Sequence, residues 1–121
     1  MFEDGRKAED YEPNLDLGLW IGGRVNGEVV ATCHFIPRTS VMAEIHPAVL
    51  RPFRKEYAYL FTTNCVEIGK RHWNKILAVT PMCERSTINY AIKHGFKVEG
   101  FLKSAWLKDG KLWDMAQLSY E

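Results

Sequence analysis

Apolar and polar residues alternate along the first half of the chain. The alternation covers residues 17–21 and again residues 29–35, a period of two that is typical of strands with one buried face. Asn26-Gly27 separates the two runs, and this pair suits a type I′ hairpin turn, in which both central residues need positive φ. A third alternating run covers residues 41–46. The pattern predicts three consecutive antiparallel strands.

The period then becomes helical. From Glu56 the apolar positions recur every three to four residues, which indicates a helix with one buried stripe. Residues 75–80 form a short, continuously apolar run, typical of a strand buried on both faces. A strand, a helix and a strand in this order predict a right-handed unit with parallel strands. A second helix is expected from about Glu84 to His94, where Gly95 is suited to end it.

Two further strands are expected, over residues 97–107 and residues 111–120, joined by an Asp-Gly turn. Residues 1–16 have no apolar period and are expected to form an irregular arm, so the core is expected to span residues 17–121. The order is three strands, a helix, a strand, a helix and two strands. The sequence therefore predicts one α/β (α+β) domain with a mixed, mostly antiparallel sheet and helices on its faces.

Composition narrows the class of protein. A length of 121 residues fits one domain, and 46% hydrophobic with 26% charged residues is usual for a globular protein. A net charge of +1 offers no electrostatic basis for binding nucleic acid or an anionic membrane, and no apolar run reaches the length of a membrane span. The three cysteines form no CxxC pair. We therefore expect reduced thiols in a cytoplasmic protein, with no metal site.

The end of the chain carries a motif. The run HGFKVEGFL at residues 94–102, followed by DGK at residues 109–111 and by Asp114, resembles the ending of GNAT acyltransferases, especially those that acetylate protein or peptide amines. The order of elements also resembles the GNAT fold without its first strand and first two helices. The resemblance covers roughly residues 17–120. It implies a GNAT-like acyl-CoA-binding core and an acetyl transfer from acetyl-CoA to an amine, made directly within a ternary complex.

The resemblance also implies where acyl-CoA binds. The pantetheine arm would pair with exposed backbone where two parallel strands splay apart, here beside Ile45 and residues 76–80, with Pro47 placed to start the splay. The pyrophosphate would rest on the N-terminus of the following helix, where free N–H groups and the helix dipole favour anions. The family's loop at this point reads Q/R-x-x-G-x-G/A. The corresponding run in this chain is RKEYAY at residues 54–59.

This loop departs from the family's pattern because it lacks glycine, and in this it resembles a phage-encoded branch of GNAT-like proteins. Tyr57 and Tyr59 replace the small residues that let phosphates approach the backbone, and we expect their rings to narrow the pyrophosphate site. Arg51, Arg54 and Lys55 offer side-chain charge instead, although a solvated basic turn is the alternative. The predicted cofactor contacts are Ile45, Arg51, Arg54, Lys55, Glu56, Tyr57, Ala58 and Tyr59.

Acyl transfer to an amine needs a base for the ammonium proton and an acid for the leaving thiolate. Glu44 is the predicted base, because it lies mid-strand beside the splay and on the face opposite Ile45. His46 is the second candidate, and a purely structural role is the alternative for each. The family's acid is a tyrosine at the position of Ala91. Tyr90 lies about 100° away around the helix, so we do not expect it to replace that tyrosine.

Two classes of function stay open. The favoured class is an enzyme whose partners are acyl-CoA and an amine-bearing small molecule or peptide. The alternative is a non-catalytic GNAT-fold protein, such as a viral assembly or host-interaction module, which Tyr57, Tyr59 and Ala91 favour. A peptide bound along the sheet edge that the missing first strand would leave is a third reading. A homodimer is compatible with the sequence.

Overall fold

The structure is a computed structural model that describes residues 18–121, so the expectation for residues 1–16 lies outside the described residues. The elements follow the order that the sequence predicts. In that part of the chain, no helix has the length and hydropathy needed to cross a membrane. The elements are β1 (Leu19–Val25), β2 (Glu28–Pro37), β3 (Met42–Val49), a 3-10 turn η2 (Arg51–Phe53), α1 (Arg54–Lys70), β4 (Lys75–Pro81), α2 (Arg85–Lys93), β5 (Lys97–Lys108) and β6 (Lys111–Tyr120).

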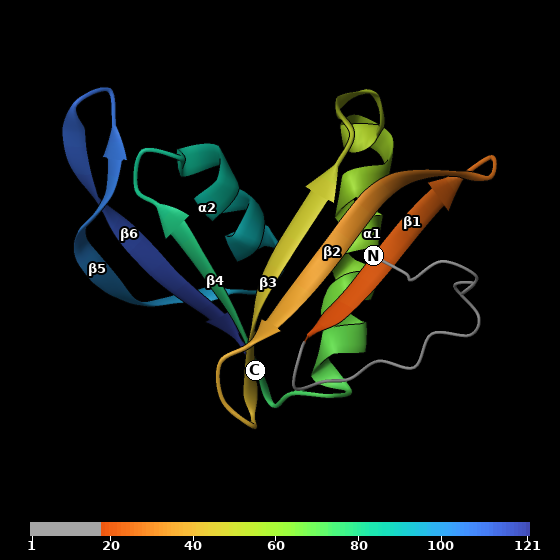
Figure 1. The fold of residues 1–121 in the computed structure, drawn as a ribbon, viewed down its shortest axis with the longest axis horizontal. Coiled ribbons are helices and arrows are strands. Elements are labelled where there is room, and N and C mark those ends of the chain that lie inside the picture. The colour runs from red at the N-terminus through yellow and green to blue at the C-terminus, as the bar shows by residue number, and fades with distance from the viewer. Residues whose placement is uncertain (1–17) are drawn as a thin grey trace, which may run out of the picture.

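The six strands form one sheet in the order β1-β2-β3-β4-β6-β5. Among the strands of residues 18–121, only β3 and β4 pair in parallel, and every other neighbouring pair is antiparallel. The prediction of a mixed, mostly antiparallel sheet is therefore confirmed. Figure 1 shows the sheet opening as a V, because β3 and β4 converge at one end and diverge toward the other.

Both described helices pack on the same face of the sheet. α1 contacts β2, β3 and β4, and α2 contacts β4. The hydroxyl of Tyr90 on α2 also lies 3.3 Å from the hydroxyl of Thr62 on α1. Two right-handed crossovers that move in the same direction along a sheet place both helices on one side. The opposite face carries no helix from residues 18–121.

Two local signals hold as predicted. Asn26 and Gly27 have φ values of 51° and 83°, as the β1–β2 turn requires. Gly95 has φ 92° and ends α2. Its N–H donates to the carbonyl of Ile92, and the next N–H, that of Phe96, donates to the carbonyl of Ala91. The Phe96 side chain is buried in the core, so this helix end positions α2 against the sheet.

The core lies between α1 and the sheet. Its largest fully buried side chains are Phe35, Ile76 and Leu118 from strands, together with Cys33 and Cys65. The hydrogen bond to Cys65 and burial both raise the pKa of Cys33 far above its ordinary value. Cys33 therefore stays a thiol and serves as a packing residue.

Gly69 is part of this core and does not end its helix. The helix α1 ends at Lys70, one residue beyond Gly69, so Gly69 still lies within its last turn. A Cβ added at Gly69 would lie 2.5 Å from Cε1 of Phe35 and 3.1 Å from Cδ1 of Ile76. Glycine is needed here because α1 approaches the sheet too closely for a side chain.

The Gly69→Ala substitution should therefore destabilise the protein. Overpacking a core typically costs about 1–3 kcal/mol, while alanine in a helix recovers up to about 1 kcal/mol relative to glycine. The midpoint of urea unfolding should fall. Gly22→Ala is the matched control, since the nearest atom to its added Cβ is 4.0 Å away. A Gly69→Ala midpoint at or above that of the wild type would contradict this account of the packing.

Candidate functional site

β3 and β4 pair over a short stretch only. Residues 42–44 pair with residues 75–77, although β3 continues to Val49 and β4 to Pro81. The strands separate beyond that point (Figure 1). The splay lies between the two strands where we expected it, but it does not start at Pro47. Separation begins earlier, and Pro47 still pairs with β2.

The backbone of β3 presents polar groups to this opening. In an antiparallel pair, the N–H and C=O of every second residue point to the same neighbouring strand. The N–H of Leu50 donates to the carbonyl of Val30 at 2.9 Å, so the even-numbered positions of β3 bond to β2. Ile45, Pro47 and Val49 therefore direct their backbone groups toward β4. Proline occupies a position at which its missing N–H removes no bond between β2 and β3.

Two adjoining cavities occupy the opening. One of 240 Å³ is lined by β3, β4, α1 and α2, and one of 570 Å³ lies nearer the start of α1. Pro47, Thr62, Thr87 and Tyr90 line both cavities. Small-molecule sites typically measure about 300–1,000 Å³, so the larger cavity alone has the volume of a ligand site.

The N-terminus of α1 borders the larger cavity. Arg54, the first residue of α1, lines it together with Ala58 and Thr62. These residues are four apart, so they form one stripe along the helix. The Nε of Arg54 donates to the carbonyl of Val49 at 2.9 Å. The predicted loop residues Arg51, Lys55 and Glu56 are exposed around the same helix end.

The rings of the two loop tyrosines lie outside both cavities. Tyr57 packs on Phe61, with ring centroids 5.9 Å apart, and its hydroxyl lies against Gly23 of β1. Tyr59 is exposed, and its ring centroid lies 4.4 Å from that of His94. Our expectation that these rings narrow the site does not hold, since the side chains at 57 and 59 are each rotated about 100° from Ala58. A contact between the cofactor and the backbone groups of Tyr57 and Tyr59 stays a hypothesis.

The two predicted catalytic residues are in contact. Glu44 is only 8% exposed, and its Oε2 accepts a hydrogen bond from Nη2 of Arg38 at 2.9 Å and lies 2.5 Å from Nε2 of His46. Because an ionised carboxylate only accepts, the neutral His46 ring donates from Nε2 and keeps its lone pair on Nδ1. His46 also lines the smaller cavity. Arg38 comes from the β2–β3 turn, and the sequence pattern did not link it to this pair.

Tyr90 lies in the opening despite its helical offset. It lines both cavities, while Ala91 lines the smaller one. Burial raises the pKa of the Tyr90 phenol, and the hydrogen bond with Thr62 partly opposes this. The phenol therefore stays protonated and can donate. Tyr90 therefore lies at the opening together with Ala91, while the expectation that it does not simply replace the family's tyrosine stays a prediction.

Several polar residues of the opening were missed from the sequence. Thr80, Thr87 and His94 line the smaller cavity, and Thr62 joins the stripe that begins at Arg54. Only Thr62 had a usable signal, namely its four-residue spacing from Ala58. Within residues 18–121, no three His, Cys, Asp or Glu side chains are grouped so as to hold a metal ion.

Comparison with known proteins shows the fold. No family model matches the sequence, and no curated protein matches it. A solved acetyltransferase of the GNAT family from Streptococcus pneumoniae is similar, with a TM-score of 0.75 and 13% identity. The alignment covers 88% of this chain and 68% of that one.

Two further solved structures agree. A mutant form of the spermidine N-acetyltransferase SpeG from Vibrio cholerae gives a TM-score of 0.77 at 13% identity, over 88% of this chain and 66% of that one. A GNAT family acetyltransferase from Elizabethkingia anophelis, solved with acetyl-CoA bound, gives 0.71 at 18%, over 86% and 76%. The chain therefore has the GNAT fold, as the resemblance of its sequence implied.

The positions of the two tyrosines make a prediction about stability. Tyr57→Ala should lower the free energy of unfolding by about 2–4 kcal/mol, somewhat less than the ~3–5 kcal/mol of a fully buried aromatic. Tyr59→Ala, on the exposed side of the same helix, should cost less than about 1 kcal/mol. Urea unfolding of both variants checks this. Equal losses would mean that Tyr57 does not anchor α1 to β1.

Proposed function

We propose that this chain is an acyl-CoA-dependent N-acyltransferase, which moves an acetyl group from acetyl-CoA to an amine within a ternary complex. The observation that supports it most is the opening between β3 and β4, where backbone groups of β3 face a cavity beside a helix N-terminus. The fold shared with GNAT acetyltransferases adds support, as does the acetyl-CoA bound to one protein of that fold.

The opening fits the chemistry of the pantetheine arm. The arm carries amide groups, each with one donor and one acceptor, as a peptide strand does. The carbonyls of Ile45 and Pro47 accept from such amides, and the N–H of Val49 donates to them. Because Pro47 has no N–H, the edge of β3 offers the arm one fewer hydrogen-bond donor than a regular strand edge would. Thr62 and Thr87 add hydroxyls along the cavity wall.

The start of α1 fits the pyrophosphate. Helix N-termini present free N–H groups and the positive end of the dipole, and here those groups include the N–H of Lys55 and of Glu56, which follow the N-cap Phe53. Arg54 lies at the cavity, and its guanidinium holds four N–H donors besides the one given to Val49. Arg51 and Lys55 add positive charge nearby. Ala58 adds a small side chain to the wall of the larger cavity. Tyr59 contributes only its backbone groups to the proposed cofactor site.

The chain's own groups supply the proton transfers. Acetyl-CoA, when bound, offers a thioester carbonyl to the amine, so that a C–N bond replaces the C–S bond. His46 accepts the proton that the amine loses, through Nδ1. Glu44 holds the ring by accepting from Nε2, and Arg38 holds Glu44. Tyr90, protonated because of its burial, returns a proton to the departing sulfur.

The Arg54→Ala substitution tests the anion site. Charged hydrogen bonds contribute about 1.5–3 kcal/mol, so affinity for acetyl-CoA, measured by calorimetric titration, should fall about 10- to 150-fold. Higher salt should weaken the wild type more than the variant. Arg71→Ala, at the opposite end of α1, removes the same charge from outside the cavities and should leave affinity unchanged. Absence of acetyl-CoA binding by the wild type at millimolar concentration would favour the non-catalytic alternative.

Separate substitutions of Glu44 and His46 test the proton transfer. Base catalysis contributes about 10²–10⁴-fold, so His46→Gln should lower turnover within that range and remove the acidic limb of the pH–rate profile. Glu44→Gln should lower turnover yet keep that limb, because His46, the proposed base, is still present. Acetyl-CoA affinity should barely change in either variant, since both side chains lie on the face away from the helices. If the acidic limb of the pH–rate profile is lost in Glu44→Gln but is intact in His46→Gln, then Glu44 is the base.

A further inference from the structure

The sheet face without helices carries a row of aromatic side chains. Trp20, His34 and His46 occupy matched positions on β1, β2 and β3. The rings of Trp20 and His34 stack, with centroids 3.9 Å apart and planes within 6°. Neighbouring strands lie about 4.8 Å apart, so the row extends about 10 Å from the β3–β4 opening. Trp20, at its far end, is 43% exposed.

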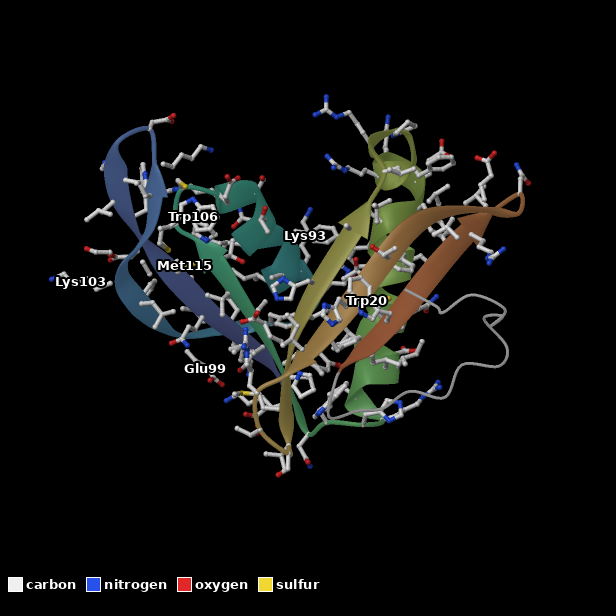
Figure 2. The ribbon with its side chains drawn as sticks, in the orientation of Figure 1. Trp20, Lys93, Glu99, Lys103, Trp106 and Met115 are labelled. Atoms are coloured by element: carbon white, nitrogen blue, oxygen red, sulfur yellow. The ribbon has the colours of Figure 1, made fainter. Side chains whose placement is uncertain are left out.

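The other side of the opening is apolar on the same face. Leu77 of β4 pairs with Glu44, and the alternation of a strand places Val79 on that face too. Met115 of β6 pairs with Pro81, two residues further along. Figure 2 shows Trp20 on the β1–β3 side of the V and Met115 on the other side. An acceptor reaching His46 from this face therefore lies between aromatic and aliphatic walls.

Two carboxylates that residues 18–121 place on this face beside the opening, those of Glu44 and Glu99, are already paired. Glu44 accepts from Arg38, and Glu99 accepts from Lys75 at 2.7 Å. The hydrogen bond with Lys75 lowers the pKa of Glu99 below its ordinary value. Burial, with a smaller contribution from the neighbouring His46, lowers the pKa of His34 below its ordinary value. A polyamine or a lysine-rich peptide needs carboxylates that are not neutralised, whereas an uncharged aromatic body does not.

We infer that the acceptor is a primary amine on an aromatic body, an arylalkylamine, which lies along the row from Trp20 to His46 with its amino group at His46. This inference rests on the proposed acetyl transfer and names its substrate class. The body of the acceptor contacts His34 and Trp20, while Leu77 and Val79 of β4 lie beyond the amino group, on the other side of His46. Trp20 is then a specificity residue that acts on acceptor binding and not on the proton transfer.

The experiment compares phenethylamine, spermidine, a lysine-containing peptide and methylamine as acceptors, with CoA release as the readout. Phenethylamine should have the highest kcat/KM. Trp20→Ala should raise its KM about 2- to 12-fold, the range expected from aromatic pairs, with kcat unchanged and with no effect on methylamine, which is too short to reach Trp20. Trp20→Phe should restore most of the affinity and covers the case in which the alanine variant folds poorly.

Trp106→Ala is the matched control, because Trp106 is 44% exposed and pairs with Trp113, beyond the end of β4. It should not change the KM for phenethylamine. A higher kcat/KM for spermidine or the peptide would overturn the inference, and so would an unchanged KM in Trp20→Ala.

A binding experiment separates this inference from the proposed function. The indole N–H signal of Trp20 is followed by NMR as phenethylamine is added, with Trp20→Phe assigning the signal. If acetyl-CoA does not bind, that result contradicts the proposed acetyl transfer only. A saturable shift of the Trp20 signal would still support the arylalkylamine site, and an unmoved signal would overturn it.

Discussion

Three residue pairs between β3 and β4 are the constraint on which the site depends. Strands that stayed paired to their ends would leave no cavity, and strands that never paired would separate the molecule into two small sheets. The short parallel ladder holds both halves while antiparallel ladders stabilise each half on its own. Glu44 belongs to the last of the three pairs. Its side chain is therefore held at the narrow end of the V, where the two halves of the sheet are joined.

The angular positions of residues on the two helices decide which side chains reach the opening. α1 turns the stripe of Arg54, Ala58 and Thr62 toward it, while Tyr57 faces the core on the next side of the same helix. The turn at Gly95 determines how α2 lies, so that Tyr90 projects into the cavities. Since both helices share one face, the opposite face is left to the side chains of Glu44 and His46.

The order of elements and the turns could be read from the sequence, because each depends on local rules, while the location of the opening was implied by the resemblance to the GNAT fold. Asn26-Gly27 and Gly95 required positive φ, and the strand–helix–strand order required parallel pairing. Side-chain direction could not be read in the same way. Whether Tyr57 faces a ligand or the core depends on a rotation of 100° per residue about an axis that only packing defines. Arg38 was missed because a turn residue meets Glu44 only once β2 and β3 are in register.

The backbone edge of β3 along the opening has one more consequence. A sheet edge with unpaired N–H and C=O groups is a template on which other chains can aggregate. This edge is recessed between two halves of a sheet and is roofed by two helices, unlike the outer edges formed by β1 and β5 in the described sheet. This edge is therefore less open to pairing with another protein's strand than the outer edges of the sheet are.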